Sequence, residues 1–182
     1  DTVNFTTSEE DGCWTPLHMA AQSGSVDCIE LLLQHGANIE AAKSDGSTPL
    51  RIAASHGQLL AVKCLIENGA RGTVTDNKNQ LPLHSACRNN HVDVARLLLE
   101  KYPDTVNCTT TVEHGCWTPL HMAAEKGHVD CIELLLQYGA DITAVTSDGR
   151  TPVHTAAFNG RLLAVKYLLE KEVQETATNN KG

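Results

Sequence analysis

Short segments with helical spacing of apolar residues recur along the chain, and polar, turn-forming segments separate them. Thr15 and Pro16 form a helix start, because threonine is a good N-cap and proline suits the first helical position. We expect a first helix from Pro16 to about Ser23. Gly24 should end it, since glycine readily adopts the positive φ at which helices stop.

A second helix is predicted over residues 25–35, ending at Gly36. Its apolar face is expected to be buried and consists of Val26, Cys28, Ile29, Leu32 and Leu33. Helices this short are marginally stable alone, so their stability must come from stacking on neighbouring helices.

This helix pair follows a short motif, Thr-Pro-Leu-His or a close variant, which occurs five times. The five copies start at Thr15, Thr48, Leu81, Thr118 and Thr151, in steps of 33, 33, 37 and 33 residues. A pair of small residues follows each copy, then a glycine or asparagine, then an apolar segment. Between these units, polar segments such as 43–46 and 146–149 predict projecting β-turns. A fixed period of this length is typical of solenoids.

The motif, its spacing and the small-residue pairs together resemble the ankyrin repeat over essentially the whole chain. The resemblance implies one all-α domain over residues 1–182, a solenoid of stacked helix-turn-helix units with projecting β-hairpin loops. The expected repeats cover approximately residues 11–43, 44–76, 77–113, 114–146 and 147–173, with a polar C-terminal tail at 174–182. The small pairs fit where helices of adjacent repeats approach too closely for larger side chains.

A second level of repetition is present, because residues 1–70 match residues 104–173 at an offset of 103 with 46 of 70 positions identical. The array therefore reads as a three-repeat unit that has been duplicated. Solenoids need polar repeats at their ends, and no such repeat precedes Thr15. We therefore expect the chain to be a segment of a longer array or multidomain protein that covers its ends.

Composition narrows the class of partner. The chain of 182 residues has a formal net charge of −8, which disfavours binding to nucleic acid or to an anionic membrane. Neither a membrane-spanning apolar run nor a signal segment is evident, so no membrane insertion is expected. The seven cysteines are an odd number without a Cys-x-x-Cys pair, which favours reduced thiols in the cytoplasm over disulfides or a zinc site.

Catalytic and cofactor motifs are missing from the sequence, including the phosphate-binding loop, the dinucleotide fingerprint, the nucleophile elbow and the zinc-protease helix. We therefore predict no enzyme activity, no cofactor and no metal. In ankyrin repeats the motif histidine ties the motif to neighbouring loops by hydrogen bonds, so a structural role is implied for His18, His84, His121 and His154. No acid or nucleophile recurs with them as a catalytic partner would.

The resemblance implies that a partner protein or peptide binds the concave face. This face is lined by the loop tips, by the residue before each motif and by the two residues after each small pair. The candidate contact residues are Trp14, Ser55, His56, Lys78, Arg88, Trp117, Glu125, Lys126, Arg150 and Phe158. Between the duplicated halves, the two residues after each small pair differ, as does Ser47 from Arg150, whereas helix-packing positions do not. Two interpretations of these differences are open: the halves have distinct recognition surfaces, or exposed residues have drifted freely.

Trp14 and Trp117 each follow a loop that is longer than the others. The steps from Asn4 to Thr15 number eleven, against eight from Glu40 to Thr48. Each tryptophan is either a binding hot spot or a filler beneath the longer loop.

Two motif positions depart from the pattern, and two asparagines raise a further question. Arg51 replaces the motif histidine and Leu81 replaces the threonine, so we expect weaker local hydrogen bonding there, with the third repeat least well capped. Asn90 stands in place of a glycine, although asparagine tolerates positive φ. The resemblance also raises hydroxylation of Asn4 or Asn107, which follow a valine as in some hydroxylated arrays.

Three functional hypotheses follow. The first is a non-catalytic scaffold that binds a protein or peptide through the concave face and loop tips. The second is a targeting or regulatory segment of a larger enzyme, channel or bacterial effector. The third is weak self-association through uncapped ends of the solenoid.

Overall fold

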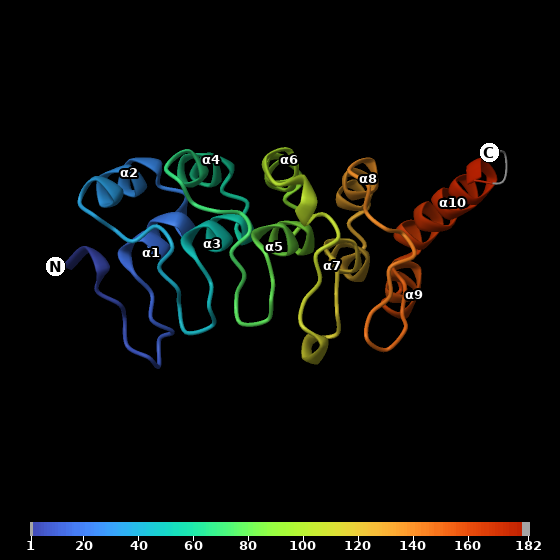
Figure 1. Ribbon diagram of the computed structural model, residues 1–182, viewed down its shortest axis with the longest axis horizontal. Coiled ribbons are helices and arrows are strands. Elements are labelled where there is room, and N and C mark those ends of the chain that lie inside the picture. The colour runs from blue at the N-terminus through green and yellow to red at the C-terminus, as the bar shows by residue number, and fades with distance from the viewer. Residues whose placement is uncertain (1, 180–182) are drawn as a thin grey trace.

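The computed structural model describes residues 2–179 and contains ten α-helices and three short 3₁₀ helices over that range (Figure 1). The α-helices are α1 (Pro16–Ser23), α2 (Val26–Gln34), α3 (Pro49–Ser55), α4 (Leu59–Glu67), α5 (Pro82–Arg88), α6 (Val92–Lys101), α7 (Pro119–Lys126), α8 (Val129–Gln137), α9 (Pro152–Phe158) and α10 (Leu162–Asn179). The 3₁₀ helices are η1 (Thr2–Asn4), η2 (Pro103–Thr105) and η3 (Val112–His114).

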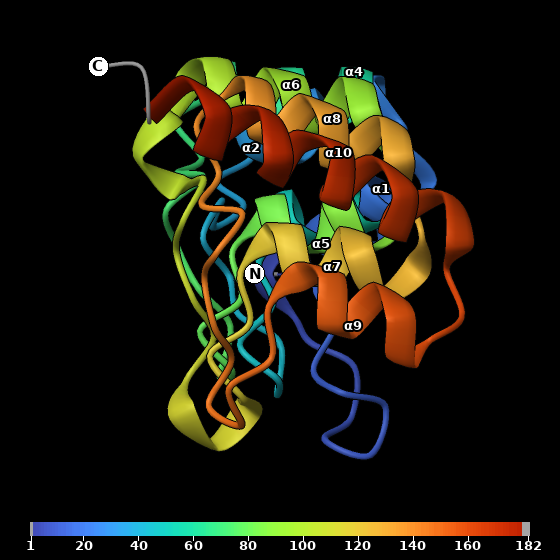
Figure 2. The same cartoon turned by 90° about the vertical axis from the view of Figure 1, so that its right-hand side faces the viewer.

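The helices form two parallel rows. The odd-numbered helices α1 to α9 make an inner row, and the even-numbered helices α2 to α10 make an outer row above it (Figure 1). Each inner helix packs on the next inner helix and on its own outer partner. Seen end-on, the loops project away from both rows (Figure 2). Loops and inner helices therefore enclose the concave face, and the all-α solenoid that the sequence predicted is confirmed.

The inner helices begin as the motif predicts. In α1 the backbone N–H of His18 donates to Thr15 Oγ1 at 3.4 Å, and the backbone N–H of Thr15 donates to His18 Nδ1 at 3.2 Å. This reciprocal pair satisfies two N–H groups that a helix start leaves free. The helix ends at Gly24, whose φ is +76°.

Backbone hydrogen bonds close each loop internally and also hold it to the next loop. Over the described range no residue forms a β-strand, and the second loop closes with bonds from Lys43 N to Ser47 O and from Gly46 N to Lys43 O. One backbone hydrogen bond connects each loop to the next. The four bonds are Ser44 N to Gly12 O, Asn77 N to Asp45 O, Thr111 N to Lys78 O and Ser147 N to Gly115 O. The projecting hairpins are thus tight turns fixed in a row by their neighbours.

Burial depends on position in the stack. Of α2 only Ile29 is buried and Cys28 is exposed, although the sequence predicted that Cys28 and its apolar neighbours would be buried. In α8, which has the same sequence as α2, Cys131 is fully buried. The prediction for Cys28 is wrong because, within residues 2–179, no repeat covers the outer side of α1 and α2.

The last outer helix is longer than the others. Helix α10 continues through residue 179, past residue 173 where the sequence predicted the fifth repeat to end. Residues 174–179 of the predicted polar tail therefore continue this helix. Residues 180–182 of that tail, and residue 1, lie outside the described residues.

Candidate partner-binding surface

The motif histidines fix the base of each loop. Nδ1 of His18 accepts a backbone N–H, which leaves Nε2 to donate to Ser47 O at 2.9 Å. His84 and His121 contact Trp117 O and Arg150 O in the same way, at 3.2 and 3.0 Å. Burial lowers the pKa of His84 to about 4, so this side chain is neutral at pH 7. These bonds hold the residue before each motif, which faces the concave surface.

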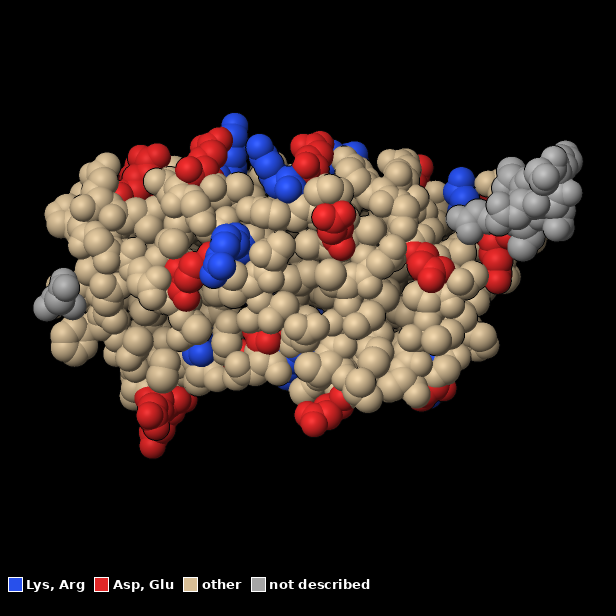
Figure 3. Space-filling view, viewed as in Figure 1, with Lys and Arg blue, Asp and Glu red and all other residues tan. Residues whose placement is uncertain are grey.

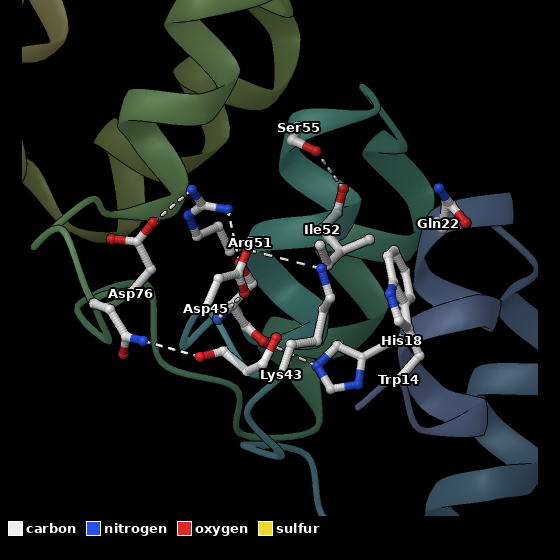
Figure 4. Close-up of polar contacts among 12 residues, drawn as sticks. Trp14, His18, Gln22, Lys43, Asp45, Arg51, Ile52, Ser55 and Asp76 are labelled. Atoms are coloured by element: carbon white, nitrogen blue, oxygen red, sulfur yellow. Dashed lines mark hydrogen bonds and ion pairs between the residues drawn. The ribbon is translucent and has the colours of Figure 1, made fainter. Parts of the chain in front are cut away.

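Arg51 connects repeats by a different route. Its guanidinium lies 2.6 Å from Asp76 Oδ2 and also donates to Gln80 Oε1 and Ser47 Oγ, both at 3.0 Å (Figure 4). The other Asp76 oxygen accepts the backbone N–H groups of Lys78 and Gln80, each at 2.8 Å. At the cap itself the predicted weakening is present, because α3 has the bond from Arg51 N to Thr48 Oγ1 at 3.4 Å without the reciprocal histidine bond of α1. The sequence did not predict that the longer Arg51 side chain would reach an acid in the next loop.

The third repeat lacks the threonine N-cap of the other repeats, as the sequence predicted. Leu81 has no side-chain acceptor, so the start of α5 has the bond from Leu81 N to His84 Nδ1 at 3.1 Å, and the His84 backbone N–H donates to Leu81 O at 3.1 Å instead of to a threonine hydroxyl. The Leu81 side chain is buried instead. Asn90 adopts a positive φ of 59°, the conformation that glycine supplies in other repeats.

Asn4 and Asn107 each connect a long loop to the following repeat. Asn4 Nδ2 donates to Gly36 O at 3.1 Å, and its Oδ1 accepts the Asn38 N–H at 2.8 Å. Asn107 makes the same two contacts with Gly139 and Asp141. Both amides therefore have a structural role, and their hydroxylation stays a prediction.

The two tryptophans have different surroundings although the sequence around them is the same. Lys43 Nζ lies 4.1 Å from the centroid of the Trp14 ring and 3.7 Å from Asp45 Oδ2 (Figure 4). The lysine thus covers one face of the Trp14 indole with a cation–π contact. Trp14 itself is half-buried at the first-repeat end of the row.

Trp117 lacks that cover. The position that corresponds to Lys43 is Thr146, and its hydroxyl donates to Asp148 Oδ1 at 2.5 Å and accepts the Arg150 N–H at 3.0 Å. Threonine is too short to reach over the indole. Trp117 instead lines a hollow of about 210 Å³ between the third and fourth repeats. The residues lining this Trp117 hollow are Lys78, Gln80, Arg88, His114, Trp117, Met122 and Glu125.

The hollow brings together four of the ten residues predicted from the sequence, namely Lys78, Arg88, Trp117 and Glu125. Lys126 adjoins it, because Glu125 lies between Arg88 and Lys126 at 3.7 and 3.5 Å. At the C-terminal end of α7, two cations therefore share the one carboxylate of Glu125.

The other predicted residues lie in three further places. Ser55 Oγ contacts His56 Nδ1 at 2.9 Å at the end of α3. Arg150 lies over the Phe158 ring, with its guanidinium carbon 4.7 Å from the centroid, and Phe158 is 74% exposed. Trp14 is separate from both. The structure thus divides the ten predicted residues into a central hollow and outlying groups.

Sequence reasoning missed three residues that line the hollow. Gln80 directly precedes the third motif, as Trp117 precedes the fourth, so its position was a signal that could have found it. His114 belongs to the extended loop, where spacing alone does not tell which side chain turns inward. Met122 lines the hollow and is buried, which the repeat pattern indicates only as packing.

Charge differs between the two long loops. Acidic side chains stand at the lower tips of the loops in the space-filling view (Figure 3). The first long loop carries Glu9, Glu10 and Asp11, and the second carries Val112, Glu113 and His114 at the same positions. The loop beside the Trp117 hollow therefore has two fewer carboxylates than the loop beside Trp14.

Comparison with known proteins identifies the class. A family described as ankyrin repeats, three copies per unit, matches residues 2–76, 38–111 and 103–179, so the chain belongs to the ankyrin repeat family. This family binds protein partners.

Individual relatives match over short segments only. The human 2-5A-dependent ribonuclease is 52% identical over 46 residues, which are 25% of this chain and 6% of that protein. The mouse 2-5A-dependent ribonuclease is 50% identical over 40 residues, 22% of this chain and 5% of that protein. The Oryza sativa subsp. japonica protein named "Probable E3 ubiquitin-protein ligase XBOS32" is 59% identical over 39 residues, 21% and 8% respectively. The chain thus covers less than a tenth of each relative.

None of the helices within residues 2–179 has the length and apolar character of a membrane span. The same residues include no group of three or more His, Cys, Asp or Glu side chains placed to hold a metal ion.

Proposed function

We propose that the chain is a non-catalytic recognition module that binds a partner protein or peptide through its concave face and loop tips. The observation that carries this proposal is the Trp117 hollow, where a half-buried indole, two cations and a carboxylate from two loops and two helices surround one space. An aromatic residue beside arginine at the centre of a hollow is the composition of a binding hot spot.

The exposed Phe158 with Arg150 extends this surface toward the fifth repeat. Ser55 and His56 extend it toward the second repeat along the ends of the inner helices, where Asn89 Nδ2 donates to Ser55 O at 3.1 Å. Both extensions hold the residues that differ between the duplicated halves. The loop-to-loop backbone bonds keep the whole face rigid, which lowers the entropy cost of binding.

A second candidate is that this module targets or regulates a larger enzyme. Two relatives have enzyme names, a ribonuclease and a probable ubiquitin ligase, and this chain matches only 6% and 8% of their lengths. In this candidate the matched repeats serve a protein whose enzyme part lies elsewhere. A recognition role in a reducing compartment such as the cytoplasm fits either candidate, since all seven cysteines are free thiols.

Self-association is a third candidate and would use the first repeat. Its outer side has a hollow of about 560 Å³ lined mostly by apolar atoms, including Met19 and Leu31. A second copy of the chain is the occupant we propose for this case. Light scattering over a range of protein concentrations tests it, with Leu31→Glu expected to keep the molecular mass at the monomer value.

Affinity capture from a cell lysate, read by quantitative mass spectrometry, tests the main proposal. The bait is the chain beside its Trp117→Ala/Arg150→Ala/Phe158→Ala variant, with Lys63→Ala on the outer surface of α4 as the matched control. A protein captured by the chain and the control but lost with the triple variant supports recognition through the concave face. Equal capture by all three baits contradicts it.

A further inference from the structure

We infer that the Trp117 hollow binds an acidic, extended peptide segment of the partner and takes one apolar side chain of that segment as its anchor. This inference rests on the proposed recognition function and makes it specific. It also assigns different roles to the two tryptophans: Trp117 contacts the partner, whereas Trp14 is a structural residue.

Lys43 in the first half is replaced by Thr146 in the second half. Both residues occupy the same position in the duplicated halves. Each lies in the loop after a repeat whose motif is preceded by a tryptophan. Lys43 occupies the face of Trp14 with its ammonium group at 4.1 Å from the ring centroid. The Thr146 hydroxyl bonds to Asp148 and to the Arg150 backbone and does not cover the indole. The Trp117 ring therefore keeps a face toward the hollow.

The volume of the hollow limits what it can hold. An apolar cavity of about 150 Å³ accepts a ring the size of benzene. The Trp117 hollow has about 210 Å³, with Trp117 and Met122 among its lining residues, which suits one leucine-sized or aromatic side chain. We take an extended segment as the form of ligand because it can present that side chain with acidic residues on either side.

The charges around the hollow favour an acidic ligand. Lys78 is exposed and makes no ion pair among the described side chains, while Arg88 and Lys126 share the single carboxylate of Glu125. The neighbouring loop has replaced Glu9 and Asp11 of the first half by Val112 and His114. Cations thus outnumber carboxylates at this point of a chain whose net charge is −8, and acidic residues beside the anchor would meet them.

A protein or peptide fits this site better than a nucleic acid. Glu125 lines the hollow, and Glu113 stands in the adjoining loop, where both would repel a run of phosphates. A peptide can alternate its carboxylates with uncharged residues and avoid these two acids.

The test selects peptides without knowledge of the natural partner. A displayed library of random twelve-residue peptides is selected on the chain and counter-selected on Thr146→Lys, which copies the residue that the first half already carries. We expect enriched peptides to contain one large apolar residue flanked by aspartate or glutamate. Enrichment of neutral or basic peptides would overturn the assigned chemistry, and a selection that enriches nothing would overturn the peptide ligand.

Intrinsic fluorescence then locates the site, because the chain has two tryptophans. In Trp14→Phe the remaining indole is Trp117, and an enriched peptide should shift its emission with saturation. In Trp117→Phe the same peptide should leave Trp14 emission unchanged. A shift of Trp14 instead, or equal binding by Thr146→Lys, would overturn the location while leaving concave-face recognition standing.

Two exposed cations provide a test that does not depend on Thr146→Lys folding. Lys78→Ala with Arg88→Ala should weaken the enriched acidic peptide by about tenfold or more and reduce its salt dependence. Lys63→Ala on the outer surface should leave affinity unchanged. A single-stranded DNA decamer that binds with the same dependence on Lys78 and Arg88, and more tightly than the peptides, would overturn the peptide assignment.

Discussion

At the scale of single residues, one side chain in each of the first four repeats connects the motif to the next loop. In three repeats it is a neutral histidine, and in the second repeat it is Arg51 paired with Asp76. A histidine needs only a carbonyl acceptor, whereas an arginine brings a charge that must be matched in the buried site. The two solutions therefore respond differently to mutation and to pH.

Arg51→Ala should lower the free energy of unfolding by about 3–5 kcal/mol, because it leaves the carboxylate of Asp76 buried without its counter-charge. The side chains of Arg51 and Asp76 are 14% and 3% exposed, while those of the surface pair Lys63 and Glu67 are 61% and 63% exposed. Lys63→Ala should therefore cost less than about 1 kcal/mol. Urea unfolding of both variants checks this, and equal losses would contradict it.

The free energy of unfolding should fall as the pH is lowered from 6.5 to 4. Burial lowers the pKa of His84 from 6.5 to about 4, so over this window the unfolded chain binds a proton that the folded chain does not. The loss from His84 alone is about 3 kcal/mol by linkage. Burial also lowers the pKa values of His18 and His121, which adds to the same slope.

Urea unfolding at several pH values measures this slope, with His84→Gln as the control. Glutamine cannot take up the proton, so the variant should be less stable at pH 7 but should lose less stability on acidification. A variant with an unchanged slope would show that His84 is not responsible.

At the scale of helices, the duplication places the same sequence in two environments. Leu134 in α8 is 2% exposed, and its counterpart Leu31 in α2 is 57% exposed. Met122 in α7 and Met19 in α1 differ in the same direction, at 4% and 46%. The difference comes from the third repeat, whose helices α5 and α6 pack on α7 and α8. Packing between repeats, rather than sequence, decides which side chains are buried.

Leu134→Ala should therefore destabilise the chain by about 2–5 kcal/mol, the cost of removing a well-packed leucine. Leu31→Ala makes the same chemical change at an exposed site and should cost under about 1 kcal/mol. Thermal unfolding of the two variants provides the comparison. Similar losses at both positions would mean that α2 is covered in solution.

The sequence predicted the helices well because each short helix has its own start and stop residues. Thr15 and Gly24 mark α1 without reference to the rest of the chain. What could not be predicted depends on contacts between repeats. The exposure of Cys28 and the bond from Arg51 to Asp76 require knowledge of which repeat lies alongside.

The candidate surface, like the fold, could be predicted from the sequence only in part. The repeat register identified Trp117 and Arg88, since the position of a residue within a repeat tells which face it occupies. It could not separate Trp117 from Trp14, because their flanking motifs are identical. The difference depends on Lys43 and Thr146, which lie about thirty residues further along the chain, and on the wall supplied by the third repeat.

At the scale of the whole molecule, the chain is a one-dimensional stack in which each repeat contacts only its neighbours. An interior repeat is stabilised by two interfaces and a terminal repeat by one. Local opening should therefore be easier in the first and fifth repeats than in the second, third and fourth. The Trp117 hollow lies between the third and fourth repeats, so its geometry belongs to the interior of the stack.

Native-state hydrogen exchange tests this gradient with an internal control. Helices α2 and α8 have the same nine-residue sequence, so their amides share nearly the same intrinsic exchange rate. Mass spectrometry distinguishes them, because His35 follows one helix and Tyr138 the other. We expect α8 to exchange slower than α2 by at least about tenfold, since opening α8 breaks contacts with repeats on both sides. Equal protection would mean that the repeats open together as one cooperative unit, and the central hollow would then have no stability advantage over the first repeat.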